Sequence, residues 1–164
     1  NEESGRLSDR FQSVLVLGAG GTARAIVGAL DGVATQITVL GRSDSRRSAL
    51  EMAVTRSTFS YQRWRDSLDF TPFDLIVNTT PAGAADILAS STPSQIGSTL
   101  FDVIYKPWPT VLASRWRDAG GQVVNGGEML LFQGIRQIEL ALELQLDHSK
   151  LAAFVRPLLA VDAS

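Results

Sequence analysis

The chain has no cysteine, one histidine and only two lysines among its 164 residues. Without cysteine, disulfide bonds, cysteine-based zinc sites and thiol chemistry are excluded. Any mechanism that needs a catalytic lysine must use Lys106 or Lys150, because every other basic residue is an arginine. The single histidine, His148, stands in a polar segment, and we expect it to have no chemical role.

Extreme charge and long apolar runs are also absent. A formal net charge of −2 and a pI near 5.4 give no electrostatic reason to expect a nucleic-acid partner. No apolar run approaches the roughly 18 residues of a membrane span, so no membrane attachment is expected. Residues 1–6 lack the basic and apolar regions of a signal peptide, and a cytoplasmic location is expected. They also lack an initiator methionine, so we expect the polar lead of residues 1–12 to be a cut end.

Strand-like and helix-like segments alternate after this lead, and 45% hydrophobic residues suit one domain with a full core. Strands are predicted near residues 13–17, 36–40, 57–61, 73–78, 99–104 and 122–124. Helices are predicted near 21–31, 43–55, 110–119, 127–146 and 149–161. Such alternation predicts an α/β fold, a doubly wound parallel sheet of about six strands with helices on both faces.

A glycine-rich turn follows the first predicted strand, in the order Gly18, Ala19, Gly20, Gly21, Thr22 and Ala23. Gly18 permits a tight turn, and Gly20 lacks the Cβ that would keep a pyrophosphate off the backbone. A helix that opens at Gly20 or Gly21 points its free N–H groups and positive dipole end at the phosphates. Ala23 lets that helix lie close to its strand. Alone the motif is weak, because glycine-rich turns are common structural features.

The second predicted strand ends in Gly41-Arg42-Ser43. A site for NAD has an acidic residue at this place to bind the ribose hydroxyls, whereas a site for NADP has an arginine for the 2′-phosphate. Arg42 and Arg46 are four residues apart and can bind that phosphate from one face. The alternative is a solvated basic helix start, since Arg47 also has no assigned partner. The pattern favours NADP as the cofactor.

The helix predicted near 127–146 is apolar nearly all round. Leu131, Ile135, Ile138 and Leu142 form one stripe, and further apolar residues widen it, namely Leu130, Phe132, Leu140, Ala141 and Leu144. Two interpretations stay open: a thick core helix, or a helix whose second face packs against a partner or a missing domain. Pro157 is expected to kink or end the following helix.

Three further motifs follow later strands: Asn78–Gly83, Asp102–Thr110 and Asn125–Gln133. With the glycine turn and Gly41-Arg42-Ser43 in the same order, residues 13–146 resemble the C-terminal, NADP-binding domain of shikimate dehydrogenase. The resemblance implies a Rossmann-type domain over 13–126, with the helices of 127–164 packing toward a substrate domain. It also implies reversible, NADPH-dependent reduction of 3-dehydroshikimate to shikimate, on the route to chorismate and the aromatic amino acids.

The resemblance also implies roles for individual residues. The residues from Gly18 to Ala23 would hold the pyrophosphate. Gly41, Arg42, Ser43 and Arg46 would recognise the 2′-phosphate, with Gly41 departing from the family's usual Asn. Thr79, Thr80 and Pro81 would line the cofactor, Val103 and Gly126 would contact its nicotinamide portion, and Tyr105 and Gln133 would reach shikimate.

Each of these motifs also has a structural interpretation. Asn78–Pro81 suits a polar strand exit, and Tyr105 suits a half-buried aromatic. Gln133 is harder to explain structurally, because an amide buried in an apolar helix needs partners. Glu128 and Gly134 stand where the family more often has Gly and Ala.

The family transfers its proton through a Lys–Asp pair from an N-terminal substrate domain, which nothing before residue 13 supplies. Lys106 is no obvious replacement, because Asp102 is three residues back on a strand whose side chains alternate. We therefore expect an excised domain that binds cofactor without turning over substrate, and that associates with itself through the 127–146 helix. The alternatives are a quinate/shikimate or related NADP oxidoreductase, and a non-catalytic NADP-binding module.

Overall fold

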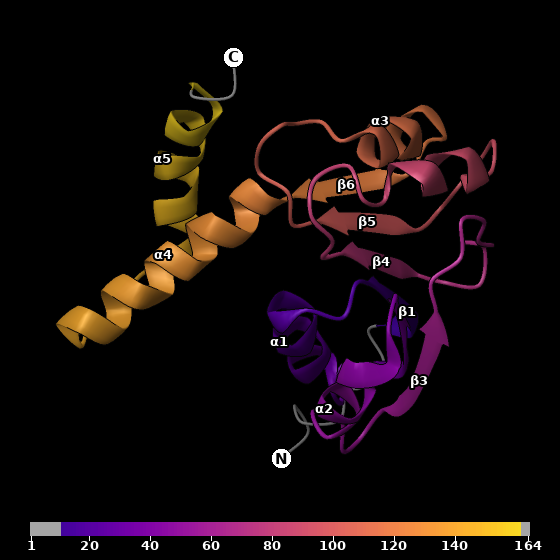
Figure 1. Ribbon diagram of the computed structural model, residues 1–164. Helices are drawn as coiled ribbons and strands as arrows, with labels where there is room; N and C mark the ends of the chain where they lie inside the picture. Colours follow the sequence, from indigo (N-terminus) through magenta and orange to yellow (C-terminus); the bar gives the residue numbers. More distant parts are fainter. Residues whose placement is uncertain (1–10, 162–164) are drawn as a thin grey trace.

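Six parallel strands form a single sheet in the computed structural model, which describes residues 11–161 (Figure 1). In chain order the strands are β1 (Phe11–Leu17), β2 (Ala34–Gly41), β3 (Thr58–Arg63), β4 (Leu75–Asn78), β5 (Thr99–Asp102) and β6 (Gln122–Asn125). Their order across the sheet is β3-β2-β1-β4-β5-β6. The chain therefore builds one half of the sheet outward from β1, then returns and builds the other half from β4. This confirms the doubly wound parallel sheet, and its topological switch lies between β1 and β4.

Helices cover both faces of this sheet. They are α1 (Gly21–Leu30), α2 (Arg47–Glu51), α3 (Val111–Asp118), α4 (Gly126–Leu142) and α5 (His148–Val161), with two 3-10 helices, η1 (Asp44–Arg46) and η2 (Asp86–Ser91). The side chains of β1 alternate between the faces, as the pleat of a strand requires. Val14 and Val16 pack with α1 and α2, while Leu15 and Leu17 pack with η2 and α3. The predicted close packing of this helix on its strand is confirmed, since Ala23 is fully buried against Val14 and Val16.

Several element boundaries differ from the prediction. The helix predicted over 43–55 is only η1 followed by the short α2, β5 ends at Asp102, and η2 was not anticipated. β1 begins at Phe11, two residues earlier than predicted. The β2–β3 pairing also runs one step beyond the end of β3, because the Trp64 N–H donates to the Gly41 carbonyl at 2.9 Å.

The two C-terminal helices pack together beyond the end of β6 (Figure 1). Leu131 and Ile135 of α4 are buried against Ala152 of α5. The predicted stripe of α4 is wrong beyond this point: Ile138 is exposed, and the buried residue of that turn is Glu139. The Glu139 carboxylate accepts hydrogen bonds from the Leu146 N–H at 3.0 Å and from Arg136 at 2.9 Å, so it closes the turn between the helices.

One end of this helix pair corrects the prediction, and the other confirms the predicted range of 149–161. α4 stops at Leu142 rather than near residue 146, because Glu143 adopts a left-handed conformation with φ of 52°. α5 continues through Pro157 to Val161. The proline costs this helix one backbone hydrogen bond but does not end it. Within residues 11–161 no helix is long and apolar enough to cross a bilayer.

Candidate nucleotide-binding site

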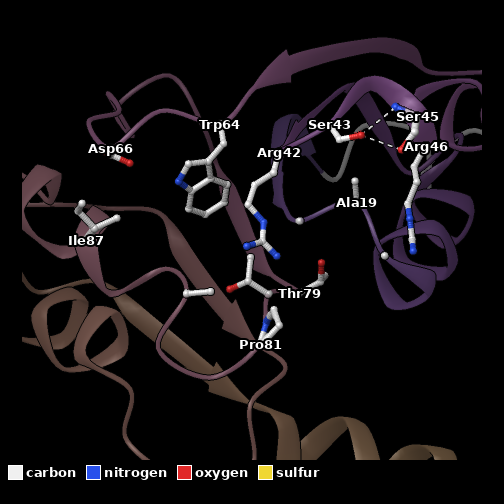
Figure 2. A pocket seen from close by; sticks show the side chains of 14 residues that line it. Ala19, Arg42, Ser43, Ser45, Arg46, Trp64, Asp66, Thr79, Pro81 and Ile87 are labelled. Carbon is white, nitrogen blue, oxygen red and sulfur yellow. Dashed lines mark hydrogen bonds between the residues drawn. The ribbon is translucent and has the colours of Figure 1, made fainter.

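A cavity of about 700 Å³ opens at the carboxyl edge of the sheet, where the topology switches direction. The residues that line it come from the ends of β1, β2, β3 and β4 and from η2 (Figure 2). They are Gly18, Ala19, Gly20, Arg42, Ser43, Ser45, Arg46, Trp64, Asp66, Thr79, Thr80, Pro81, Ala84 and Ile87. Nine of them are among the cofactor residues predicted from the sequence, so the fold brings distant motifs to one place.

The turn after β1 is held in place by Gly18. This residue has φ of +101°, which favours glycine, and its N–H donates to the Leu40 carbonyl at 2.8 Å. A Cβ at this position would stand 2.7 Å from Thr79 Oγ1. The predicted need for glycine is confirmed, and the reason includes the close approach of the β4 exit as well as the turn.

Helix α1 begins directly beyond this turn, with Gly20 as its N-cap residue. Open space surrounds Gly20 and Gly21, so no side chain blocks access to the first backbone N–H groups of the helix. The first turn carries no acidic residue that would offset the positive dipole end. Gly21 and Thr22 are exposed here, whereas Ala23 is buried beneath the helix. The start of α1 is therefore suited to bind an anion.

The cavity is cationic at the end of β2. Arg42 and Arg46 point into it on either side of Ala19 (Figure 2). Neither arginine forms an ion pair with another residue in the described part of the chain, so both guanidinium groups can bind a ligand anion. The hydroxyl groups of Ser43 and Ser45 lie between them, 2.7 Å apart.

The other end of the cavity was missed by the sequence analysis. Trp64 follows β3, Asp66 lies two residues further on, and Ile87 lies in η2 (Figure 2). Trp64 is half-buried, because one part of it packs on the core while another part faces the cavity. Trp64 could have been identified from the sequence, because it directly follows a strand that ends at the cofactor edge. No feature of the sequence distinguishes Ile87 as a site residue. This end provides flat apolar surface of the kind that binds an aromatic base.

The residues after β4 also line the cavity, with Thr79 and Pro81 below Arg42 in the view of Figure 2. The Thr79 hydroxyl donates to the Leu17 carbonyl at 2.7 Å, and the Thr80 hydroxyl donates to Asn78 Oδ1 at 2.7 Å. Both hydroxyl protons are thereby engaged, which leaves each oxygen as an acceptor for a ligand hydroxyl. Asn78 in turn donates to Asp102, whose other carboxylate oxygen accepts from Thr110 at 2.7 Å. This buried network connects the exits of β4 and β5.

Val103, Tyr105 and Gly126 lie at the same carboxyl edge, beside the cavity rather than in its lining. A Cβ on Gly126 would stand 2.1 Å from the Val103 carbonyl oxygen. Glycine is therefore required for α4 to begin so close to the β5 exit. The ring of Tyr105 packs near Gly127, 3.5 Å from the position of its missing Cβ. These residues form a surface that continues the cavity toward β6.

The other predicted residues lie elsewhere. Gly41 is buried beneath the cavity. Gln133 lies on α4 and is exposed, so the expectation of a buried amide that needs partners is wrong. His148 begins α5, with Nε2 2.9 Å from Glu139 Oε1, a structural contact. Within the described residues no cluster of histidine, aspartate and glutamate side chains can hold a metal ion.

Comparisons with known proteins agree with this geometry. No family model matches the chain. A shikimate dehydrogenase (NADP(+)) from Exiguobacterium sibiricum is 33% identical over 128 residues, which are 76% of this chain and 46% of that protein. The crystal structure of Mycobacterium tuberculosis shikimate dehydrogenase matches with a TM-score of 0.74 and 32% identity, over 87% of this chain and 56% of that one. The ligand-free 5-ketofructose reductase of Gluconobacter sp. strain CHM43 matches with a TM-score of 0.75 and 26% identity, over 95% and 60%.

The strand order, the glycine turn and the cavity at the switch point define a Rossmann-type α/β domain. Within this class the chain is a homologue of the shikimate dehydrogenases. It spans about half the length of the curated relatives that it matches.

Proposed function

We propose that the chain is the NADP-binding part of a shikimate dehydrogenase, which reduces 3-dehydroshikimate reversibly with NADPH in the cytoplasm. The observation that carries the proposal is the pair of arginines, Arg42 and Arg46, that face the cavity without an ion-pair partner in the described part of the chain. The relatives are named shikimate dehydrogenase (NADP(+)), which supports the same cofactor.

The cofactor's parts fit the parts of the cavity. The pyrophosphate lies over Gly18–Gly20 at the N-terminus of α1, because the N–H groups and the helix dipole there attract an anion. The 2′-phosphate lies between Arg42 and Arg46, where charge-assisted hydrogen bonds are strong. The adenine lies toward Trp64 and Ile87. The nicotinamide portion leaves the cavity past Thr79–Pro81 toward Val103 and Gly126.

When bound, NADPH supplies the hydride, and this chain's residues orient it. Val103 and Gly126 would contact the nicotinamide portion, and Tyr105 and Gln133 would contact the substrate. A proton donor to the substrate oxygen is also required. Neither lysine stands in the place of the family's Lys–Asp pair, which belongs to the N-terminal substrate domain. Lys150 lies on the exposed start of α5 beside Asp147, and Asp102, the carboxylate nearest to Lys106 along the chain, is held by Asn78 and Thr110. We therefore assign proton transfer to the part of the family that this chain does not span.

The apolar side chains that are exposed on α4 are consistent with a reaction site shared between this chain and another part of the family's structure. Leu130, Ile138 and Leu140 are exposed on a helix that is already packed against α5 on one side. We propose that this surface, in residues 127–146, packs against a further domain or a second copy of the chain. No nucleic acid or membrane is proposed as a partner.

Titration of the chain with NADP and with NAD tests the proposal. NADP should bind much more tightly, since each arginine contact with the 2′-phosphate is worth about 1.5–3 kcal/mol. Arg42→Ala should remove most of this preference, whereas Arg47→Ala, a neighbouring arginine outside the cavity lining, should leave it intact. Equal affinities for NADP and NAD in the wild-type chain would contradict the assignment.

A second candidate is another reductase of the same fold. The 5-ketofructose reductase matches 95% of the chain at a similar TM-score, so the fold alone does not distinguish between these reductases. Tyr105 and Gln133 would contact the substrate, but most of the substrate choice is assigned to the part of the relatives that this chain does not span. Binding of shikimate to this chain joined to the substrate domain of a shikimate dehydrogenase, compared with binding of quinate and 5-ketofructose, distinguishes these candidates.

A further inference from the structure

The side chain of Tyr61 crosses from the edge strand β3 to the segment that follows β2. Its hydroxyl donates to the Ser43 carbonyl at 2.6 Å. Burial raises the pKa of Tyr61, so the hydroxyl stays protonated and remains a donor throughout the neutral range. The bond joins β3 to a residue that lines the cavity.

Tyr61 also occupies the space beside Gly41. A Cβ at residue 41 would stand 1.8 Å from Tyr61 Oη and 2.6 Å from its Cζ, with Ala19 Cβ at 3.0 Å on the other side. Distances this short are not compatible with any side chain unless the ring moves. Gly41 and Tyr61 are therefore a matched pair, in which the tyrosine fills the place that residue 41 leaves empty.

Strand β3 holds three consecutive residues of this segment. Tyr61 binds Ser43, and Arg63 donates to the Arg42 carbonyl at 3.4 Å. Arg63 also pairs with Asp44 at 3.2 Å, which compensates the one carboxylate in the segment that would repel a phosphate. Ser43 then accepts from the Ser45 N–H at 3.2 Å, and this contact orders the turn that leads to Arg46.

We propose that Tyr61 is a positioning residue for recognition of the 2′-phosphate: its hydroxyl holds Ser43, and through it Arg42 and Arg46, in the geometry that selects NADP over NAD. This rests on the proposed function of the cavity. Tyr61 itself does not line the cavity, so its effect passes through the segment that it holds. The ligand group that it helps to select is a phosphate monoester on a ribose.

Tyr61→Phe tests this role, because it removes the hydroxyl and keeps the ring. The affinities for NADP and 2′,5′-ADP should fall about two- to tenfold, which corresponds to one hydrogen bond, while those for NAD and 5′-AMP stay unchanged. Calorimetric titration measures all four. Thr58→Val is the matched control, because it removes a hydroxyl from the same strand without touching the segment after β2, and it should change none of the four affinities.

Two results would overturn the inference. One is an unchanged NADP affinity in Tyr61→Phe, and the other is an equal loss for NADP and NAD, which a purely structural role would give. A wild-type chain that binds neither NADP nor 2′,5′-ADP would instead overturn the proposed function together with this inference.

A double-mutant cycle tests the matched pair separately. Gly41→Ala should weaken NADP binding strongly beside Tyr61, but only slightly beside Val in the Tyr61→Val background, because the smaller side chain vacates the space. Thermal unfolding of all four proteins identifies variants that fail to fold. If Gly41→Ala lowered the NADP affinity by the same factor in the wild-type and Tyr61→Val backgrounds, the pairing of Gly41 with Tyr61 would be overturned.

Discussion

Thr79 Oγ1 lies 2.7 Å from the point that a Cβ on Gly18 would occupy, and the same hydroxyl donates to the Leu17 carbonyl at 2.7 Å. The exits of β1 and β4 are thus in contact at the topological switch. A side chain at residue 18 would separate them, which would open the base of the cavity.

Gly18→Ala should destabilise the fold and weaken NADP binding. The positive φ and the contact with Thr79 together should cost about 1–3 kcal/mol of unfolding free energy. Urea unfolding measures it, and cofactor titration measures the loss of binding. Gly28→Ala is the control: Gly28 lies inside α1 with open space around it, so this change should stabilise the fold by about 0.5–1 kcal/mol. A Gly18→Ala protein as stable as wild type would contradict the close approach.

Trp64 should report on the adenine end of the cavity. Trp64→Leu should weaken 2′,5′-ADP binding by about 1–3 kcal/mol, the usual size of base stacking on an aromatic ring. Binding should also quench tryptophan fluorescence in the wild type, and Trp64→Phe should abolish most of the quenching. Trp108→Phe serves as the control, since Trp108 lies outside the cavity lining, against Arg117. Quenching that survives Trp64→Phe would place the adenine elsewhere.

Residues 1–164 alone should not reduce NADP with shikimate. Positioning of the substrate and proton transfer both need groups that neither Lys106 nor Lys150 supplies. A steady-state assay at high shikimate concentration measures this, with the full-length shikimate dehydrogenase of Exiguobacterium sibiricum as the positive control. Turnover that Lys106→Ala abolishes would show that the proton donor lies in this chain.

Acid should loosen the contact between α4 and α5. The Leu146 N–H, Arg136 and His148 lower the pKa of Glu139 from its usual 4.5 to about 2. Because the pKa of Glu139 is lower in the folded chain than in the unfolded chain, the ionised carboxylate stabilises the fold at pH values above 4.5. This contribution is lost as the pH falls from 4.5 through 2. Hydrogen exchange of the α4–α5 turn at pH 6 and pH 3 measures it. Glu139→Gln should show weak protection at both pH values; equal protection of the wild-type turn at pH 6 and pH 3 would contradict the prediction.

The exposed apolar surface of α4 should cause self-association of the isolated chain. Leu140 is 64% exposed and Leu142 is 61% exposed. Sedimentation at increasing concentration should show a rising mean mass, and Leu140→Gln should reduce it. Met52→Gln is the matched control, because Met52 is also highly exposed but lies away from α4. A wild-type chain that stays monomeric at all concentrations would contradict the role of this surface.

Much of the fold could be predicted from local pattern. The alternation of strands and helices, the turn from Gly18 to Ala23, and the arginine after β2 are all local in the chain. They were predictable because a doubly wound sheet gathers the carboxyl ends of its strands at one edge. Nine predicted residues accordingly line one cavity.

The helices after residue 126 were less predictable. The apolar pattern predicted that Ile138 would be buried and gave no prediction for Glu139. The burial of a carboxylate depends on hydrogen-bond partners that are distant in the chain. The Leu146 N–H and His148 lie after the turn, and they reach Glu139 only once α5 folds back on α4. The same reasoning placed Gln133 in a buried position, whereas it is exposed.

The sequence by itself determined the doubly wound fold and the chemical type of the site. The signals for both are local, because hydrophobic periodicity, a glycine-rich turn and an arginine at a strand end can each be recognised within a few residues. Tertiary structure alone decided which distant side chains complete the site. Trp64 and Ile87 share a cavity because β3 ends, and η2 begins, at the same edge of the sheet. Gly41 is required because the Tyr61 ring already fills its space, a steric condition that exists only when β2 and β3 pair in this register.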